Sequence, residues 1–427
     1  MLATSSPSST QESVALTTRG SRGLQILLVL AILAIVFNRL LAPSIRWDWL
    51  NLVPVLAALY IGYCVVALKK VVGSKGYVGR CLSDDPEVPK PAGAFLFSPW
   101  FRSILFIFVF LMVVEFGLRC FSYHRALQYE RQGDLLFTPV PDQQYVEKIS
   151  LTPSVINSYG LRGGPVPNQA TEAGQATILC LGDSVTYGYG VDDGHTYPAD
   201  LQRDLDQTLP GRYTVLNGGV DAYPIALEEQ KFLYLWRRGL RPEAVLIGYS
   251  FNEGGIGLQA ASGDAKIKDR IEAGVKAKNK LRSIALYTLI VENWARHYYD
   301  RIKGHMVPGT NFMQLSDTEA ASIYGQFLDH AASDLRAHQV KPVFVLFAGY
   351  DGRTGRYDDQ GAFQREFATY AQQNGIPLFR TAEALAQGEP ANADLRRYFI
   401  DHAHMSEQGT AKVAAALAKF LPQALGN

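Results

Sequence analysis

From Ala176 onward, short apolar runs alternate with longer amphipathic stretches, and this alternation constrains the fold more than any other feature of the sequence. The apolar runs are predicted strands: Ala176–Leu181, Tyr213–Leu216, Glu243–Tyr249, Pro342–Phe347 and Ile376–Phe379. Helical spacing follows in Pro198–Thr208, Pro224–Arg238, Thr318–His338, Ala362–Gln373 and Glu407–Leu421. Strands that are apolar throughout and alternate with helices indicate a parallel sheet covered on both faces. Right-handed crossovers then predict an α/β fold with three layers, α/β/α, and about five strands.

The first 120 residues show a different pattern, in which three long apolar runs at 24–42, 49–68 and 103–118 follow a polar tail over residues 1–23. The run Trp49–Leu68 carries no charge and is long enough to cross a hydrocarbon core of roughly 30 Å. None of the runs has the polar stripe of a core helix. We therefore expect a membrane anchor over 24–120 with about three transmembrane helices. Two helices, or a cleaved signal peptide at the first run, are the alternatives.

Basic residues predict the orientation of this anchor in the lipid bilayer. They gather in the connection between the second and third runs, as Lys69, Lys70, Lys75, Arg80, Lys90 and Arg102, whereas the first connection has only Arg46. Since cytoplasmic loops carry the excess of Lys and Arg, we expect a cytoplasmic N-terminus. Three crossings would then place the catalytic domain outside the cytoplasm, in the periplasm or extracellular space. Arg119, Arg125 and Arg131 count against this orientation.

Composition excludes several classes of protein. The chain has 41 Lys+Arg, 40 Asp+Glu and a net charge of +1, which argues against a nucleic-acid partner. Its 4 cysteines are too few for a disulfide scaffold. We divide the remainder into a linker and lead-in segment at 121–175 and a catalytic domain at 176–427 with an insertion at about 254–316. That basic insertion is either a solvated helical excursion or a lid or surface for an anionic substrate.

Residues that can take part in catalysis follow the predicted strands. In parallel sheets, ligands bind beyond the carboxyl ends of the strands. Ser184 comes after the first strand, Gly219 after the second and Asn252 after the third, and Asp401 and His404 precede the final helix. A backbone N–H at Gly219 and the amide of Asn252 would suit an oxyanion hole. Asp401 is close enough in sequence to bind one ring nitrogen of His404 while the other faces a serine. Each residue alone also fits an ordinary cap or turn.

These segments allow two other interpretations. A metal site would use His402 and His404, with Asp401 as a further ligand, but no other cluster at ligand spacing supports it. The stretch Gly255–Ala260 loosely fits a dinucleotide-binding pattern, but it follows the third strand of the domain and not the first. We therefore expect no cofactor and no metal.

Together, these blocks resemble the SGNH (GDSL-type) hydrolase family, whose four motifs supply Ser, Gly, Asn and His in that order. They fall here on Ser184, Gly219, Asn252 and His404, and Asp401 completes an Asp-x-x-His element. The stretch Ile156–Gly163 also resembles a lead-in of some members, and the likeness covers roughly residues 138–427. Val185 replaces the usual Leu of the first block, and Glu253 replaces the common Asp of the third.

The resemblance implies a flavodoxin-like SGNH fold and a serine esterase or acylhydrolase. Ser184 would attack an ester carbonyl, His404 would take its proton, and Asp401 would hold the imidazole. The N–H groups of Ser184 and Gly219, with the Asn252 amide, would form the oxyanion hole. An alternative is an O-acyltransferase acting on a cell-surface polysaccharide, which would require a membrane partner as acyl donor. A non-catalytic glycan-binding module is the third reading. The expected substrate is an ester or an acylated glycan.

Overall fold

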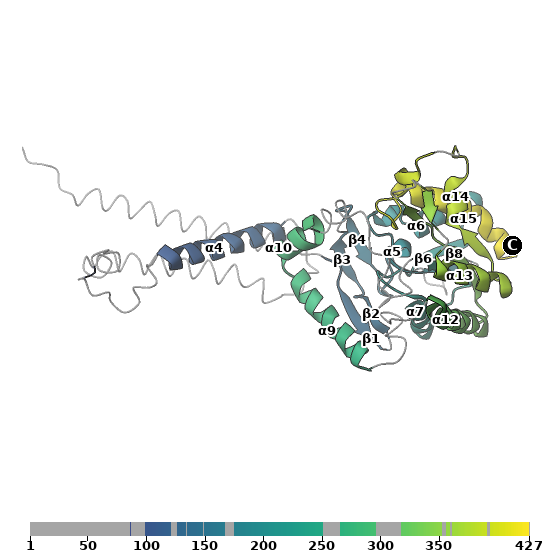
Figure 1. Ribbon diagram of the computed structural model, residues 1–427, viewed down its shortest axis with the longest axis horizontal. Coiled ribbons are helices and arrows are strands. Elements are labelled where there is room, and N and C mark those ends of the chain that lie inside the picture. Colours follow the sequence, from purple (N-terminus) through teal and green to yellow (C-terminus); the bar gives the residue numbers. More distant parts are fainter. Residues whose placement is uncertain are drawn as a thin grey trace, which may run out of the picture. The chain divides into compact units, whose positions relative to one another are not determined.

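The computed structural model describes Pro86 and residues 99–120, 126–133, 135–147, 149–166, 175–250, 265–295, 317–351, 356–358, 361–390 and 393–426. The chain divides into two compact units, Met1–Tyr123 and His124–Asn427. The second unit contains the whole predicted catalytic domain and the lead-in segment from residue 124 onward (Figure 1).

The described part of the first unit is mainly one helix, α4 (Pro99–Cys120). Many of its apolar side chains are exposed, and Trp100 is 81% exposed. Over the residues that the structure describes, we find no helix with the length and apolar character needed to cross a membrane. This finding includes α4, within which the predicted span at 103–118 lies. The predicted spans at 24–42 and 49–68 lie outside the described residues.

A parallel sheet of five strands forms the centre of the second unit, in the order β11-β8-β7-β5-β6. Its strands are β5 (Ala176–Leu181), β6 (Tyr213–Asn217), β7 (Ala244–Tyr249), β8 (Lys341–Leu346) and β11 (Leu378–Arg380). Every neighbouring pair is parallel. The predicted strands are confirmed within one or two residues at each end.

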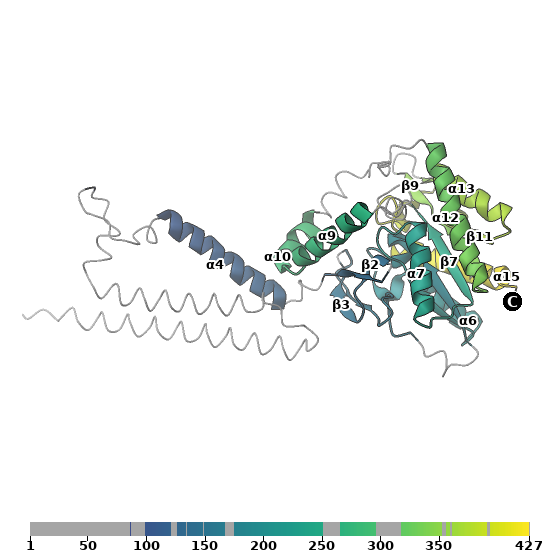
Figure 2. The ribbon, with the colours of Figure 1, turned by 90° about the horizontal axis from the view of Figure 1, so that it is seen from below.

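Side-chain alternation along the strands divides the core between the two faces of the sheet. On one face, Ile178 and Cys180 of β5 pack against α6 (Tyr197–Thr208) and α15 (Glu407–Ala424). On the other, Leu179 and Leu181 pack against α7 (Ile225–Arg237), α12 (Asp317–Ala337) and α13 (Ala362–Gln373). Figures 1 and 2 show these helices on both sides of the sheet, which confirms the three layers.

Local capping explains where the helices of the first layer begin. Thr196 accepts a hydrogen bond from the N–H of Ala199 at 3.3 Å, and Pro198 lies in the first turn of α6. Ser406 accepts one from the N–H of Gly409 at 3.3 Å and starts α15. Each of these side chains accepts a hydrogen bond from a backbone N–H of the first turn that has no acceptor within the helix. Short elements complete the core: α5 (Ser184–Tyr187), η3 (Asp193–His195), α14 (Thr381–Ala386) and η5 (Leu395–Tyr398).

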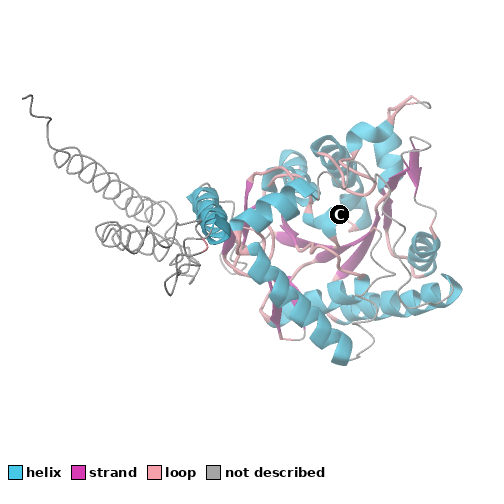
Figure 3. Ribbon diagram, turned by 60° about the vertical axis from the view of Figure 1, so that its left-hand side comes forward, coloured by secondary structure: helices cyan, strands magenta, loops and turns pink. Residues whose placement is uncertain are grey.

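Antiparallel hairpins form in segments where no strand is evident from the sequence. They pair β1 (Tyr129–Gln132) with β2 (Leu135–Pro139), β3 (Gln143–Val146) with β4 (Pro153–Ile156), and β9 (Gly349–Asp351) with β10 (Arg356–Asp358). The described part of the insertion is helical, with α9 (Ala265–Arg282), α10 (Ala285–Tyr287) and the π-helical η4 (Thr288–Ala295). Figure 3 shows these helices and hairpins around the central sheet.

Candidate active site

Ser184 lies at the turn where β5 ends and α5 begins. Gly182 makes this turn with a φ of +154°, and a Cβ there would lie 2.0 Å from Oγ1 of Thr186. Asp183 caps α5 by accepting a hydrogen bond from the N–H of Val185 at 2.9 Å. A side chain at position 182 is thus excluded, and Ser184 is placed at the N-terminus of a helix. This is the position predicted for a nucleophile.

His404 joins Ser184 to Asp401. Its Nε2 lies 2.8 Å from Oγ of Ser184, and its Nδ1 lies 2.7 Å from Oδ2 of Asp401. The other oxygen of Asp401 accepts hydrogen bonds from the backbone N–H groups of His404 and Ala403, each at 2.8 Å. The loop before α15 is therefore folded around the Asp401 carboxylate, and the imidazole is held at both nitrogens. The structure brings together the three side chains predicted for the triad.

Electrostatics in this group favour a charged imidazole beside a charged carboxylate. Burial alone would lower the pKa of His404, but Asp401, Asp183 and Asp221 outweigh it and raise that pKa above the usual 6.5. Burial likewise raises the pKa of Asp401, but the charge and hydrogen bond of His404 and two backbone N–H groups hold it well below its usual range. The pair is thus suited to accept a proton at His404.

Gly219 lies directly against the helix that carries Ser184. A Cβ on Gly219 would lie 2.1 Å from the backbone nitrogen of Tyr187, so no other residue fits there without displacing α5. The loop is tied to the preceding one, because Val220 donates its N–H to the carbonyl of Gly182 at 3.0 Å. The N–H of Gly219 itself donates to Oδ1 of Asn217 at 3.1 Å. Asn252, the other predicted oxyanion donor, lies outside the described residues.

Arg162 of the lead-in segment holds the loop that follows α5. Its guanidinium donates to the carbonyls of Gly188 at 2.6 Å, Val191 at 2.7 Å and Tyr187 at 3.0 Å, and to Oδ1 of Asp193 at 2.8 Å. It is only 4% exposed. The sequence predicts no role for Arg162, and its signal there is only a basic residue beside glycines in the lead-in.

Three further residues around the triad were missed. Ser250, at the end of β7, donates its hydroxyl to Oδ2 of Asp183. The ring of Tyr189 lies 4.3 Å from the ring of His404 between centroids, tilted by 35°. Asp221 raises the pKa of both His404 and Asp183. None stands in a motif, because only the approach of separate loops places them here.

A metal site at His402 and His404 finds no support in this geometry. Both ring nitrogens of His404 are already engaged, by Ser184 and Asp401, so none is left to bind a metal. Nδ1 of His402 lies 4.0 Å from Oδ1 of Asp401.

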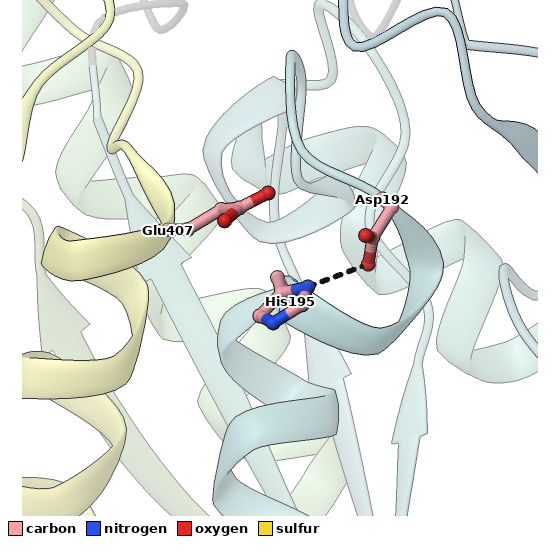
Figure 4. Close-up of side chains that lie close together, drawn as sticks. All are labelled: Asp192, His195 and Glu407. Carbon is pink, nitrogen blue, oxygen red and sulfur yellow. Dashed lines mark hydrogen bonds and ion pairs between the residues drawn. The ribbon is translucent and has the colours of Figure 1, made fainter.

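Elsewhere, Asp192, His195 and Glu407 have potential ligand atoms within 4.8 Å of one another (Figure 4). Asp192 there caps η3 and accepts from the His195 ring at 2.8 Å, so a helix cap accounts for the positions of these two residues.

Residues 180–412 match the GDSL-like lipase/acylhydrolase family. The chain belongs to this family. The match begins at the end of β5 and spans Ser184, Gly219, Asp401 and His404, while the lead-in hairpins lie before it. Family membership supports an ester-hydrolysing enzyme.

Solved structures resemble the chain at low sequence identity. The psychrotrophic esterase EstA from Pseudoalteromonas sp. shares 11% identity with a TM-score of 0.35, over 59% of this chain and 100% of EstA. A lipolytic G-D-S-L family protein from Veillonella parvula DSM 2008 shares 14% sequence identity with a TM-score of 0.35, over 58% of this chain and 98% of that protein. TesA shares 15% sequence identity with a TM-score of 0.36, over 58% of this chain and 99% of TesA. No curated protein matches the chain.

Proposed function

We propose that this protein is a serine hydrolase that cleaves a carboxylic ester through an acyl-enzyme. The observation that carries the proposal is the unbroken hydrogen-bonded series from Asp401 through His404 to Ser184. A serine hydroxyl is a weak nucleophile unless a base accepts its proton, and an oriented imidazole is such a base.

The reaction proceeds in two steps, formation of the acyl-enzyme and its hydrolysis. Oγ of Ser184 bonds to the ester carbonyl carbon while His404 Nε2 takes the hydroxyl proton. The C–O bond to the alcohol then breaks, and His404 returns the proton to the departing alkoxide. Water repeats the sequence on the acyl-enzyme, releasing the carboxylic acid and restoring Ser184. Asp401 stays ionised and stabilises the imidazolium in both steps.

The tetrahedral oxyanion requires donors, for which we propose the N–H groups of Ser184 and Gly219 and the side chain of Asn252. Each such donor contributes on the order of 3 kcal/mol to stabilising the transition state. Because the Gly219 N–H is bonded to Asn217 Oδ1, it must exchange this acceptor for the substrate oxygen. Asn217 also donates its Nδ2 to the carbonyl of Tyr187 at 3.2 Å, so the exchange leaves that side chain with a partner.

The same acyl-enzyme would serve an O-acyltransferase if a sugar hydroxyl replaced water as acceptor. The triad does not distinguish the two acceptors, and esters or acylated glycans fit both reactions. Mass spectrometry of oligosaccharides incubated with the protein and a soluble acyl donor separates them. Transfer adds an acyl group to the sugar, whereas hydrolysis releases only the free acid.

Labelling by a fluorophosphonate tests the nucleophile directly. We expect the probe to modify Ser184 and the protein to hydrolyse a short-chain aryl ester. Ser184→Ala should lose both activities, with kcat reduced by about 10⁶-fold as for other serine triads. Modification of a different residue, or full activity in Ser184→Ala, would refute the proposal. Peptide mapping by mass spectrometry identifies the labelled site.

A further inference from the structure

Helix α9 of the insertion packs on the lead-in segment with one face only. Ile271 and Val275 pack against a cluster that includes Tyr129 and Leu136. One turn later, Asn279 accepts a hydrogen bond from the N–H of Tyr129 at 3.2 Å. These side chains of α9 are spaced by four positions and therefore share a face of the helix. Figure 1 shows α9 running beside β1 and β2.

The opposite face of α9 is exposed and consists of basic, small and apolar residues. Its members are spaced by three, four or seven positions, so they form one stripe along the helix. We call this stripe the outer stripe, and all of its members are exposed: Lys266, Arg270, Ala273, Gly274, Ala277, Lys280 and Leu281. Three bases with small residues between them allow a broad anionic surface to approach closely.

The two carboxylates of α9 leave the outer stripe positive. Glu272 is half-buried and accepts from Lys276 at 2.7 Å and from Arg131 of β1 at 2.9 Å, so two bases offset its charge. Asp269 lies at the edge of the stripe by the same helical spacing. Lys278 is exposed as well. The outer side of α9 thus carries a surplus of positive charge.

Exposed apolar side chains gather at the C-terminal end of α9. Leu281 is 43% exposed, and Ile290 and Val291 of η4 are 47% and 42% exposed. The residues that follow them, Arg282 and Glu292, form an ion pair, with Nη2 of Arg282 3.4 Å from Oε2 of Glu292. This pair brings the three apolar side chains to the same end of the helix. A basic helix with exposed apolar side chains is typical of a segment that lies on a bilayer surface.

The same end of α9 lies where the chain enters the second unit. Nη1 of Arg282 donates to the carbonyl of Leu127 at 2.7 Å. Residues 121–126 join Leu127 to Cys120, the last residue of α4, and a connection of that length reaches at most about 25 Å. Since α4 contains the span expected from the sequence at 103–118, the connection keeps the bilayer of that span within reach of α9.

We propose that the outer stripe of α9, together with the exposed part of η4, binds the surface of a bilayer that contains anionic phospholipids. The bases contact lipid phosphates, and Leu281, Ile290 and Val291 enter the headgroup region. An acidic polysaccharide would also attract the bases, but it would not bury the three apolar side chains. The contact orients the second unit on the membrane, whether or not that unit cleaves an ester.

Photo-crosslinking from position 281 tests the contact with lipid. Full-length protein carrying Leu281→p-benzoylphenylalanine is reconstituted in vesicles of phosphatidylcholine and phosphatidylglycerol in equal amounts and irradiated. Mass spectrometry should detect a phospholipid adduct at least about tenfold more abundant than from Gln372→p-benzoylphenylalanine. Gln372 is the matched control because it is exposed on α13, which Figures 1 and 2 show on another side of the unit from α9.

The role of charge is tested by removing the bases. One variant replaces the bases of the outer stripe: Lys266→Gln, Arg270→Gln and Lys280→Gln. It should reduce the adduct from position 281 at least about fivefold, because each base adds to the attraction of an anionic surface. A control variant removes the same charge from exposed sites on α13, η5 and α15: Arg365→Gln, Arg396→Gln and Lys419→Gln. It should leave the adduct unchanged.

Vesicles of phosphatidylcholine alone should lower the adduct as the first variant does, and this comparison stands even if that variant does not fold. Equal adducts from positions 281 and 372, or an adduct that does not depend on phosphatidylglycerol, would overturn the proposal. An acidic polysaccharide that binds the wild type but not the first variant, with no lipid adduct, would assign the surface to a glycan instead. None of these measurements uses ester cleavage, so a failure here leaves the proposed function untouched.

Discussion

His404 is surrounded by three acids, and this sets the pH at which it can act as a base. Asp401 binds Nδ1 of the His404 ring at 2.7 Å, and the charges of Asp183 and Asp221 also act on the imidazole. Burial disfavours the charged imidazolium and by itself would lower the pKa of His404, but the three carboxylates raise that pKa by more. The imidazole therefore holds its proton to a higher pH than a free histidine would.

A pH profile of Asp401→Asn tests this arrangement. Because the base must be unprotonated, kcat/KM of the wild type should rise with pH through an apparent pKa above 6.5. In Asp401→Asn that pKa should move to lower pH, since the largest opposing charge is gone, and kcat should fall by about 10⁴-fold. Initial rates on an aryl ester from pH 5 to 9 measure both.

Asp192→Asn is the control for that profile, because Asp192 pairs with His195 much as Asp401 pairs with His404 but lies outside the triad. It should leave kcat and the profile unchanged. Two results would show that the Asp401 carboxylate does not control the base. One is a wild-type kcat/KM that rises with pH through an apparent pKa below 6.5, and the other is an apparent pKa that Asp401→Asn leaves unchanged.

The helix carrying Ser184 is very short, so neighbouring elements must hold it. Gly219 packs on its backbone, Asp183 caps its start, and Arg162 binds the carbonyls at its end. A four-residue helix has too few internal hydrogen bonds to be stable alone. The lead-in segment thus supports the nucleophile even though it contributes no reacting group.

Arg162→Met should reveal how much this support contributes. The substitution leaves buried carbonyls without their donor and Asp193 without its partner, so the free energy of unfolding should fall by about 3–5 kcal/mol. Arg131→Met, at an exposed pair with Glu272 at 2.9 Å, should cost less than about 1 kcal/mol. Urea unfolding followed by tryptophan fluorescence compares them. Equal losses in the two variants would mean that Arg162 is no more than a surface charge.

The whole chain combines a hydrolase unit with an apolar N-terminal part whose role is still a proposal. We propose, from the sequence, that 24–42, 49–68 and 103–118 anchor the chain in the membrane. With a cytoplasmic N-terminus, an odd number of crossings places the hydrolase outside and an even number places it inside. The side on which the hydrolase lies therefore depends on the proposed crossing at 103–118, which lies within α4.

Reporter fusions at the C-terminus decide the topology in a bacterial host. Our orientation predicts an active alkaline phosphatase fusion, since this enzyme works only outside the cytoplasm, and a dark GFP fusion. Deleting Pro99–Cys120 should reverse both signals. Fluorescent GFP on the undeleted chain would place the hydrolase in the cytoplasm and reject the three-span arrangement.

The sheet and the triad were predictable because their signals are local or ordered along the chain. Each central strand is an apolar run that matches a strand buried on both faces, and β5 matches its predicted bounds. Asp401 and His404 are three residues apart, so a loop alone can bring them together. The strands of the lead-in carried no such signal, because short strands such as Gln143–Val146 contain polar residues and have one exposed side.

Periodicity and the order of the motifs were enough to predict the three-layer architecture, the family and the proposed triad, because these signals can be recognised without knowledge of contacts. The surroundings of the proposed triad became visible only in the folded chain. Arg282 and Leu127 are 155 positions apart, and Arg162 reaches the loop after α5 from the lead-in segment. Such contacts depend on how separate segments pack, and the sequence pattern does not specify the distances between those segments in space.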